Sequence, residues 1–82
     1  MYYVYLLQSE INKHIYIGST KNLRMRMDVH NRGKEFYTKL YKPWNLIYYE
    51  AYFTEKLARL REKRLKQNGN AVRELKKRIG LL

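Results

Sequence analysis

The chain is short and strongly basic: its 82 residues include 18 lysines and arginines against 7 acids, a net charge of +11. It has no cysteine, which excludes disulfides and thiolate metal sites, and no apolar run long enough to cross a bilayer. This length predicts a single domain over residues 1–82. Without a recognisable signal peptide or cysteine, a cytoplasmic location is favoured.

The positive charge is interleaved with nine tyrosines, a combination typical of proteins that bind nucleic acid. Composition does not separate DNA from RNA. It speaks against a membrane-surface protein, whose charge would gather on one amphipathic helix. We expect nucleic acid as the partner, with no membrane and no protein partner.

The first two expected elements form a β-hairpin from residues 2–8 and 14–19, both rich in β-branched and aromatic residues. A short connection makes the two strands antiparallel. If Tyr5 lies opposite Tyr16, with a turn over residues 9–12, both phenols share one face of the sheet. A slip of one residue would separate them. Side by side, they are either core packing or a site, and the hairpin alone does not decide between the two.

A helix over residues 23–31 follows and is expected to end near Gly33. Arg26 and His30 lie four residues apart, so they share one face and flank the apolar stripe of the helix. An arginine beside an apolar stripe on so basic a helix is usually a snorkelling surface residue. The histidine is either part of a site or a packing residue.

Residues 33–43 lack a clear period and are expected to form a basic, aromatic connection, with a short helical turn near residues 36–40. We expect Phe36 and Leu40 to cap one end of the core. Two lysines of this connection, Lys39 and Lys42, together with Lys21 after the hairpin, are the expected phosphate contacts.

The second half of the chain predicts a strand over residues 44–53 and helices over residues 55–68 and 70–82. Both faces of the strand carry apolar side chains, which favours a central position in the sheet. On its first face we expect Leu46, Tyr48, Glu50 and Tyr52. The order is therefore β-β-α-β-α-α, an α+β fold with a three-stranded antiparallel sheet flanked by helices.

Glu62 is the unusual residue of the first of these helices, because it shares a stripe with Ala58 and Leu65. A carboxylate turned toward the sheet costs free energy unless a cation meets it. One solution is a salt bridge to an arginine. The other is a divalent metal, which prefers hard oxygen ligands and takes the remaining ligands from phosphate and water.

The pieces together resemble the GIY-YIG nuclease domain family in its small stand-alone, UPF0213-like form. The two motif triplets stand at residues 3–5 (Tyr-Val-Tyr) and 16–18 (Tyr-Ile-Gly). The helix after the second triplet carries Arg26 and His30, and a later helix carries Glu62. The first triplet departs from the motif, with Tyr3 where the family name has glycine.

The resemblance implies a metal-dependent endonuclease or nickase that hydrolyses phosphodiester bonds in DNA with Mg²⁺ or Mn²⁺. It implies paired active-site tyrosines at Tyr5 and Tyr16, a phosphate-binding arginine at Arg26, a histidine one turn later at His30, and a metal-ligating carboxylate at Glu62. Asn68 and Asn70 are candidates for a further site residue of some relatives.

The chemistry agrees with these residue types. A guanidinium meets phosphate oxygens in bidentate geometry, and a metal on Glu62 would polarise the phosphate and stabilise the leaving oxygen. Which of Tyr5, Tyr16 or His30 takes the proton is open. The alternative function is a non-catalytic nucleic-acid-binding module that keeps the fold. The catalytic hypothesis requires all five side chains to meet on one face of the sheet.

Overall fold

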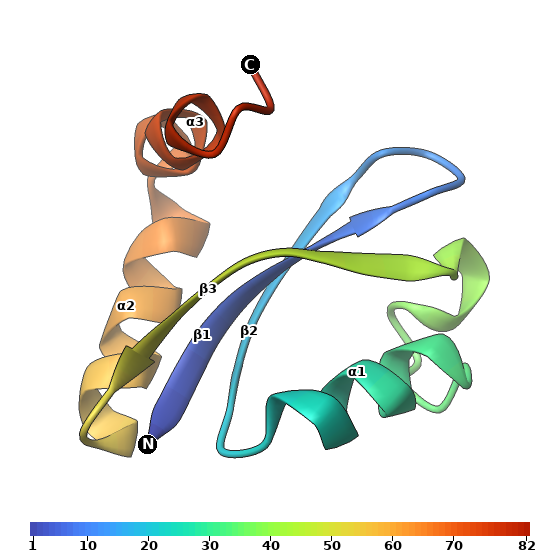
Figure 1. The fold of residues 1–82 in the computed structure, drawn as a ribbon, viewed down its shortest axis with the longest axis horizontal. Helices are drawn as coiled ribbons and strands as arrows, with labels where there is room; N and C mark the ends of the chain where they lie inside the picture. The colour runs from blue at the N-terminus through green and yellow to red at the C-terminus, as the bar shows by residue number, and fades with distance from the viewer.

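The computed structural model describes all 82 residues and confirms the predicted α+β architecture (Figure 1). Three strands and three α-helices follow in the expected order, with one short 3₁₀ helix, η1, before the last strand. Their bounds are β1 Tyr2–Ser9, β2 Ile15–Thr20, α1 Leu23–Asn31, η1 Lys39–Tyr41, β3 Trp44–Tyr52, α2 Glu55–Gln67 and α3 Gly69–Arg78. None of the helices has both the length and the apolar character needed to span a bilayer.

The sheet is antiparallel with the strand order β2-β1-β3, so β1 lies in the centre. Residues 4–7 of β1 are almost completely buried, with exposed fractions of 1% or less. The expectation that β3 is central was wrong. Apolar side chains on both faces of β3 do not require that position, because Leu46 and Tyr49 remain exposed.

The hairpin register also differs from the expected one. Tyr5 lies opposite Gly18, and Leu7 lies opposite Tyr16. The loop is longer than expected because the Ser9 hydroxyl accepts hydrogen bonds from the backbone of Ile11 and residue 12, which wraps the chain around it. The shift is two positions, so Tyr5 and Tyr16 still lie on one face, as diagonal neighbours.

An irregularity in β3 reassigns one residue to the other face. The pairing with β1 shifts between Leu6 and Leu7, so Leu6 lies opposite Tyr48 and Leu7 lies opposite Leu46. One extra residue of β3, Ile47, fits into this shift as a β-bulge. The expectation that Leu46 shares a face with Tyr48 was therefore wrong.

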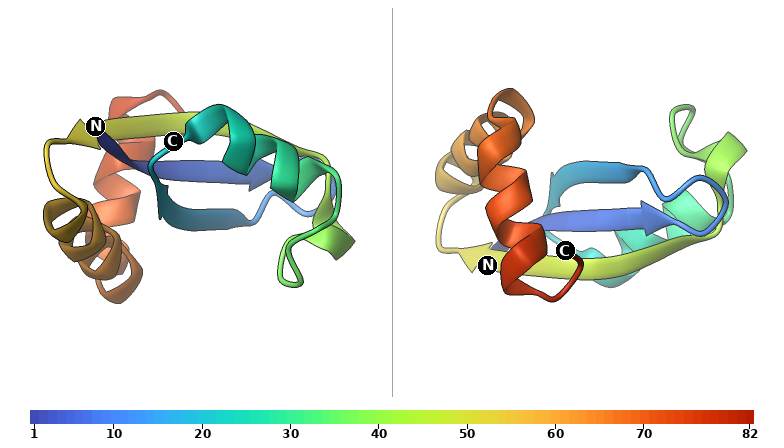
Figure 2. Two further views of the ribbon diagram at one scale, coloured as in Figure 1. Left: turned by 90° about the horizontal axis from the view of Figure 1, so that it is seen from below. Right: turned by 90° about the horizontal axis from the view of Figure 1, so that it is seen from above.

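The two faces of the sheet carry separate cores. Helices α2 and α3 pack on one face around Val4, Leu6 and Leu65. Helix α1 packs on the other face, where Tyr5, Leu7 and Trp44 form a smaller cluster. Figure 2 shows the sheet with α1 on one side and α2 on the other. The first core is the larger of the two, and the second contains Tyr5 and packs against Tyr16.

In the connection between α1 and β3, a polar side chain is buried and the large apolar side chains are exposed. Phe36 and Leu40 are 77% and 71% exposed, so the expectation that they belong to the core was wrong. Thr38 is fully buried between them, and its carbonyl accepts a hydrogen bond from Trp44 Nε1 at 2.8 Å. Because residue 38 points inward at this turn, its neighbours two positions away point outward.

Candidate active site

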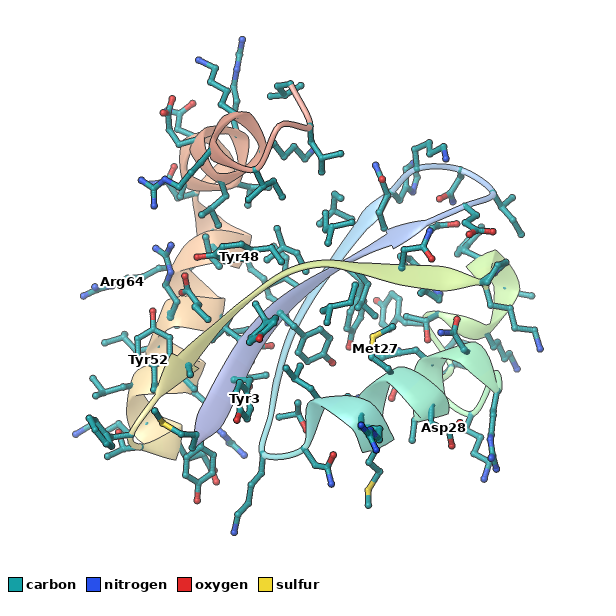
Figure 3. All side chains as sticks on the ribbon, viewed as in Figure 1. Tyr3, Met27, Asp28, Tyr48, Tyr52 and Arg64 are labelled. Atoms are coloured by element: carbon teal, nitrogen blue, oxygen red, sulfur yellow. The ribbon has the colours of Figure 1, made fainter.

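Four of the five predicted site residues converge on the α1 face of the sheet. Tyr5 Oη lies 3.0 Å from His30 Nε2, and Arg26 Nε donates to the same oxygen at 3.4 Å. The Tyr16 ring is 4.8 Å from the His30 ring. Neighbouring positions of α1 fix this orientation: Figure 3 shows Met27 turned toward the sheet, where it packs on the same cluster.

Gly18 makes the close approach between the strands possible. A Cβ atom at this position would lie 2.6 Å from Tyr5 Cζ, well inside van der Waals contact. The Tyr5 ring therefore lies across the backbone of β2 at a place that only glycine leaves open. This is the physical reason for the glycine in the second triplet.

Burial keeps both inner groups of the cluster neutral at pH 7. It raises the pKa of Tyr5 to about 12, against the opposing hydrogen bond from Arg26. Burial, and then the charge of Arg26, lowers the pKa of His30 to about 4. Tyr5 is therefore a phenol and His30 an uncharged imidazole in the free protein.

Arg26 is held in place by Glu35, which the sequence did not single out. Arg26 Nη2 lies 3.0 Å from Glu35 Oε2, and both side chains remain about one third exposed. The hydrogen bond to Tyr5 raises the pKa of the Arg26 guanidinium above its usual value, against partial burial, which lowers it. Two nitrogens of this guanidinium therefore donate within the protein, Nη2 to Glu35 and Nε to Tyr5.

Thr38 is a second residue that sequence reasoning missed. Its hydroxyl lies 2.8 Å from His30 Nδ1 and has no other side-chain partner. If the hydroxyl donates, His30 carries its proton on Nε2 and donates to Tyr5. If the hydroxyl accepts, His30 accepts from Tyr5. Only a hydroxyl in an otherwise irregular loop marks this position in the sequence, and many loop residues share that property.

Glu62 approaches β2 from the opposite face of the sheet, so the expectation that all five side chains share one face was wrong. Its Oε1 accepts from the Ser19 hydroxyl at 2.6 Å, and its Oε2 accepts from Lys66 at 2.7 Å. Ser19 directly follows Gly18, which pairs with Tyr5. The Glu62 charge still contributes to the raised pKa of Tyr5, as a minor cause after burial.

Glu62 is the one side chain here with a carboxylate for a metal ion, which would have to take most of its ligands from elsewhere. A polar hollow beside it is lined by Ser19, Arg59, Glu62, Lys63, Lys66 and Gln67. Glu62 is its only acid. Nowhere in the structure do three histidine, aspartate or glutamate side chains lie close enough together to hold a metal ion. One carboxylate with phosphate and water is a common Mg²⁺ arrangement. The Lys66 side chain, which is half exposed, would have to yield its carboxylate oxygen.

The remaining predicted residues are spread more widely. Lys21, Lys39 and Lys42 are all exposed, and Lys39 Nζ lies 4.9 Å from the centre of the Phe36 ring. Asn68 caps α3, where its Oδ1 accepts from the backbone of Asn70 at 3.0 Å. Its side-chain oxygen is therefore used by the fold.

A model of the GIY-YIG catalytic domain matches residues 1–78 of this chain. The chain belongs to the GIY-YIG family. This places it in a superfamily of nucleases, and it confirms the resemblance inferred from the two triplets and the two helices that carry Arg26, His30 and Glu62.

Similar proteins carry the name UPF0213 protein. The chain is 37% identical over 57 residues to one from Streptococcus pyogenes, a match that covers 68% of this chain and 61% of the relative. It is 35% identical over 66 residues to one from Staphylococcus aureus, covering 79% of each. The match thus spans about three fifths of the streptococcal protein. No solved structure matches the chain.

Proposed function

We propose that this protein is a metal-dependent endonuclease that nicks DNA by hydrolysing a phosphodiester bond. The observation that carries the proposal is the convergence of Tyr5, Tyr16, Arg26 and His30 at one hydrogen-bonded cluster. A guanidinium beside two phenols offers donors to the oxygens of a phosphate. The cytoplasmic location, the extent of the domain and the choice of DNA over RNA remain predictions from the sequence.

The two tyrosines of the cluster have different roles in this proposal, because one is buried and the other is partly exposed. Tyr5 is 1% exposed and stays protonated, so its role is to position the Arg26 guanidinium and the His30 ring. Tyr16 is half-buried on the edge strand β2 and is therefore less enclosed than Tyr5. We assign to Tyr16 the contact with the attacking water or the reacting phosphate, and to Arg26 the binding of the phosphate oxygens.

Glu62 supplies the ligand for a divalent cation, Mg²⁺ or Mn²⁺, completed by phosphate and water. When bound, such a cation neutralises phosphate charge and stabilises the leaving oxygen. In the free protein Ser19 and Lys66 hold the carboxylate in a fixed orientation. Lys66 then becomes available to a phosphate when it leaves Glu62.

A non-catalytic nucleic-acid-binding module is the second candidate. The observation that favours it is the ion pair between Glu62 and Lys66, which leaves the carboxylate partnered without a metal. Six ion pairs in the structure occupy only six of the 18 lysines and arginines. The remaining positive charge suffices for binding phosphates without any chemistry.

A nicking assay separates the two functions. Supercoiled plasmid is incubated with Mg²⁺ or Mn²⁺ and either the wild type, Glu62→Ala or Glu74→Ala. Glu74 is a matched control, because it is an exposed acid paired with a lysine on α3. We expect Glu62→Ala to lose nicking while it binds plasmid at least as well as the wild type, and Glu74→Ala to nick normally. No nicking by the wild type, or equal nicking by all three proteins, would favour the binding module.

A further inference from the structure

A groove runs along the edge strand β2, between that strand and α3, and meets the cluster described above at Tyr16. Its volume is about 860 Å³. Ile15 and Ile17 of β2, Leu65 of α2 and Val72 of α3 form an apolar floor. Such a floor has no role in binding phosphates, so it calls for a ligand with an apolar face.

The rim of this groove is positively charged. Lys66, Arg73 and Lys76 line it, and no acidic residue does. Arg73 and Lys76 make no ion pair within the protein. They lie on one side of α3 with Val72, because positions three and four apart share a helix face. The groove therefore combines apolar surface with unpaired cations.

Two tyrosines line this groove, and one of them also belongs to the proposed active site. Tyr16 lines the groove and also packs on His30, so it belongs to both. Tyr37 lines the groove as well, and its side chain is 78% exposed. An exposed aromatic ring beside an apolar floor and a basic rim is the arrangement on which single-stranded nucleic acids stack.

We propose that this groove binds an unpaired nucleotide of the DNA substrate next to the scissile phosphate. This inference rests on the proposed nuclease function and names its substrate class: DNA that is single-stranded or locally unpaired at the cut. A fully paired duplex hides the faces of its bases in the stack, so it offers nothing to the apolar floor. An unpaired base offers a planar apolar face, and its flanking phosphates match Arg73 and Lys76.

Binding is measured first, in EDTA and at fixed salt, so that no cleavage interferes. The probes are two fluorescently labelled DNA duplexes with equal numbers of phosphates, one fully paired and one with a two-thymine bulge. Fluorescence anisotropy gives Kd for each. We expect the wild type to bind the bulged probe at least about fivefold more tightly, the low end for one base stacked on an aromatic ring.

Tyr37→Ala should remove most of this preference, and its exposure means that the fold does not depend on it. Phe36→Ala is the matched control, because Phe36 is the neighbouring aromatic residue with 77% exposure but does not line the groove. The preference should survive in this control. Equal affinities for the two probes in the wild type, or equal losses in both variants, would overturn the proposal.

The rim is tested by the double variant with Arg73→Ala and Lys76→Ala. The control removes Lys56 and Lys77, two exposed lysines of α2 and α3 outside the groove. The rim variant should weaken binding of the bulged probe more than the control does. Equal weakening would show only general charge attraction and would overturn the proposal.

Cleavage of the same probes with Mg²⁺ or Mn²⁺ separates this inference from the nuclease proposal. Nicking of both probes at equal rates, without preferential binding, refutes the groove and leaves the nuclease. Preferential binding without nicking refutes the nuclease and leaves the groove as a nucleic-acid site. Preferential binding and faster nicking of the bulged probe support both.

Discussion

Lowering the pH from 7 to 4 should destabilise this protein through His30. Burial, and then the charge of Arg26, lowers the pKa of His30 from its usual 6.5 to about 4 in the folded state. In the pH range between these two values the unfolded chain binds a proton at His30 and the folded chain does not. The free energy of unfolding therefore falls as the pH falls.

The size of the effect follows from the two pKa values. Each pH unit within this range lowers the free energy of unfolding by about 1.4 kcal/mol, which gives an upper limit of about 3 kcal/mol. Arg26, which contributes to the shift, is partly exposed, and solvent screens its charge. We therefore expect a loss of about 2 kcal/mol, absent above pH 6.5 and complete near pH 4.

Urea unfolding of the wild type and His30→Gln at pH 7 and pH 4.5 measures this contribution. The difference between the two proteins isolates His30, because the carboxylates titrate in both. His14→Gln, in the exposed hairpin loop, should retain the full pH dependence. An NMR titration of the His30 ring, with a midpoint near 4, is the second readout. A midpoint near 6.5, or the same pH dependence in His30→Gln as in the wild type, would refute the reasoning.

Three further predictions follow from the same structure. Gly18→Ala should lower the free energy of unfolding by about 1–3 kcal/mol and abolish nicking, because the added methyl group displaces Tyr5. Gly69→Ala is the control, because no atom lies within 4 Å of the new carbon. In urea unfolding and in the nicking assay this control should lower neither the stability nor the nicking rate. Glu50→Gln should lower the free energy of unfolding by about 2 kcal/mol in urea, since Glu50 accepts hydrogen bonds from two tyrosines and Arg61 on the α2 face; unchanged stability would contradict this. The logarithm of the DNA-binding constant should fall linearly with that of salt concentration, and a flat dependence in a titration would exclude phosphate-dominated binding.

The order and type of the elements were predictable because they depend on local patterns. Alternating β-branched and aromatic residues predicted the strands, and the spacing of Arg26 and His30 placed them on one face of α1. The common face of Tyr5 and Tyr16 was also predictable, since a shift of two positions preserves it.

Features that depend on single side-chain contacts were not predictable. The register of the hairpin depends on the Ser9 hydroxyl, which holds the loop through two backbone groups. The buried position of Thr38 depends on its contact with His30. His30 lies on α1, so no pattern within the loop itself indicates this contact. The stripe of Glu62 predicted that it faces the sheet, but the stripe could not tell which of the two faces α2 covers.

The most direct test of the central claim is the initial rate of plasmid nicking by Tyr16→Phe. This substitution keeps the ring that packs on His30 and Trp44 and removes only the hydroxyl. Tyr49→Phe, at an exposed tyrosine on β3, is the control. The account predicts that Tyr16→Phe nicks about 100-fold more slowly than the wild type, the lower limit for a group in acid–base catalysis, while Tyr49→Phe nicks normally. Equal rates for all three proteins would contradict it.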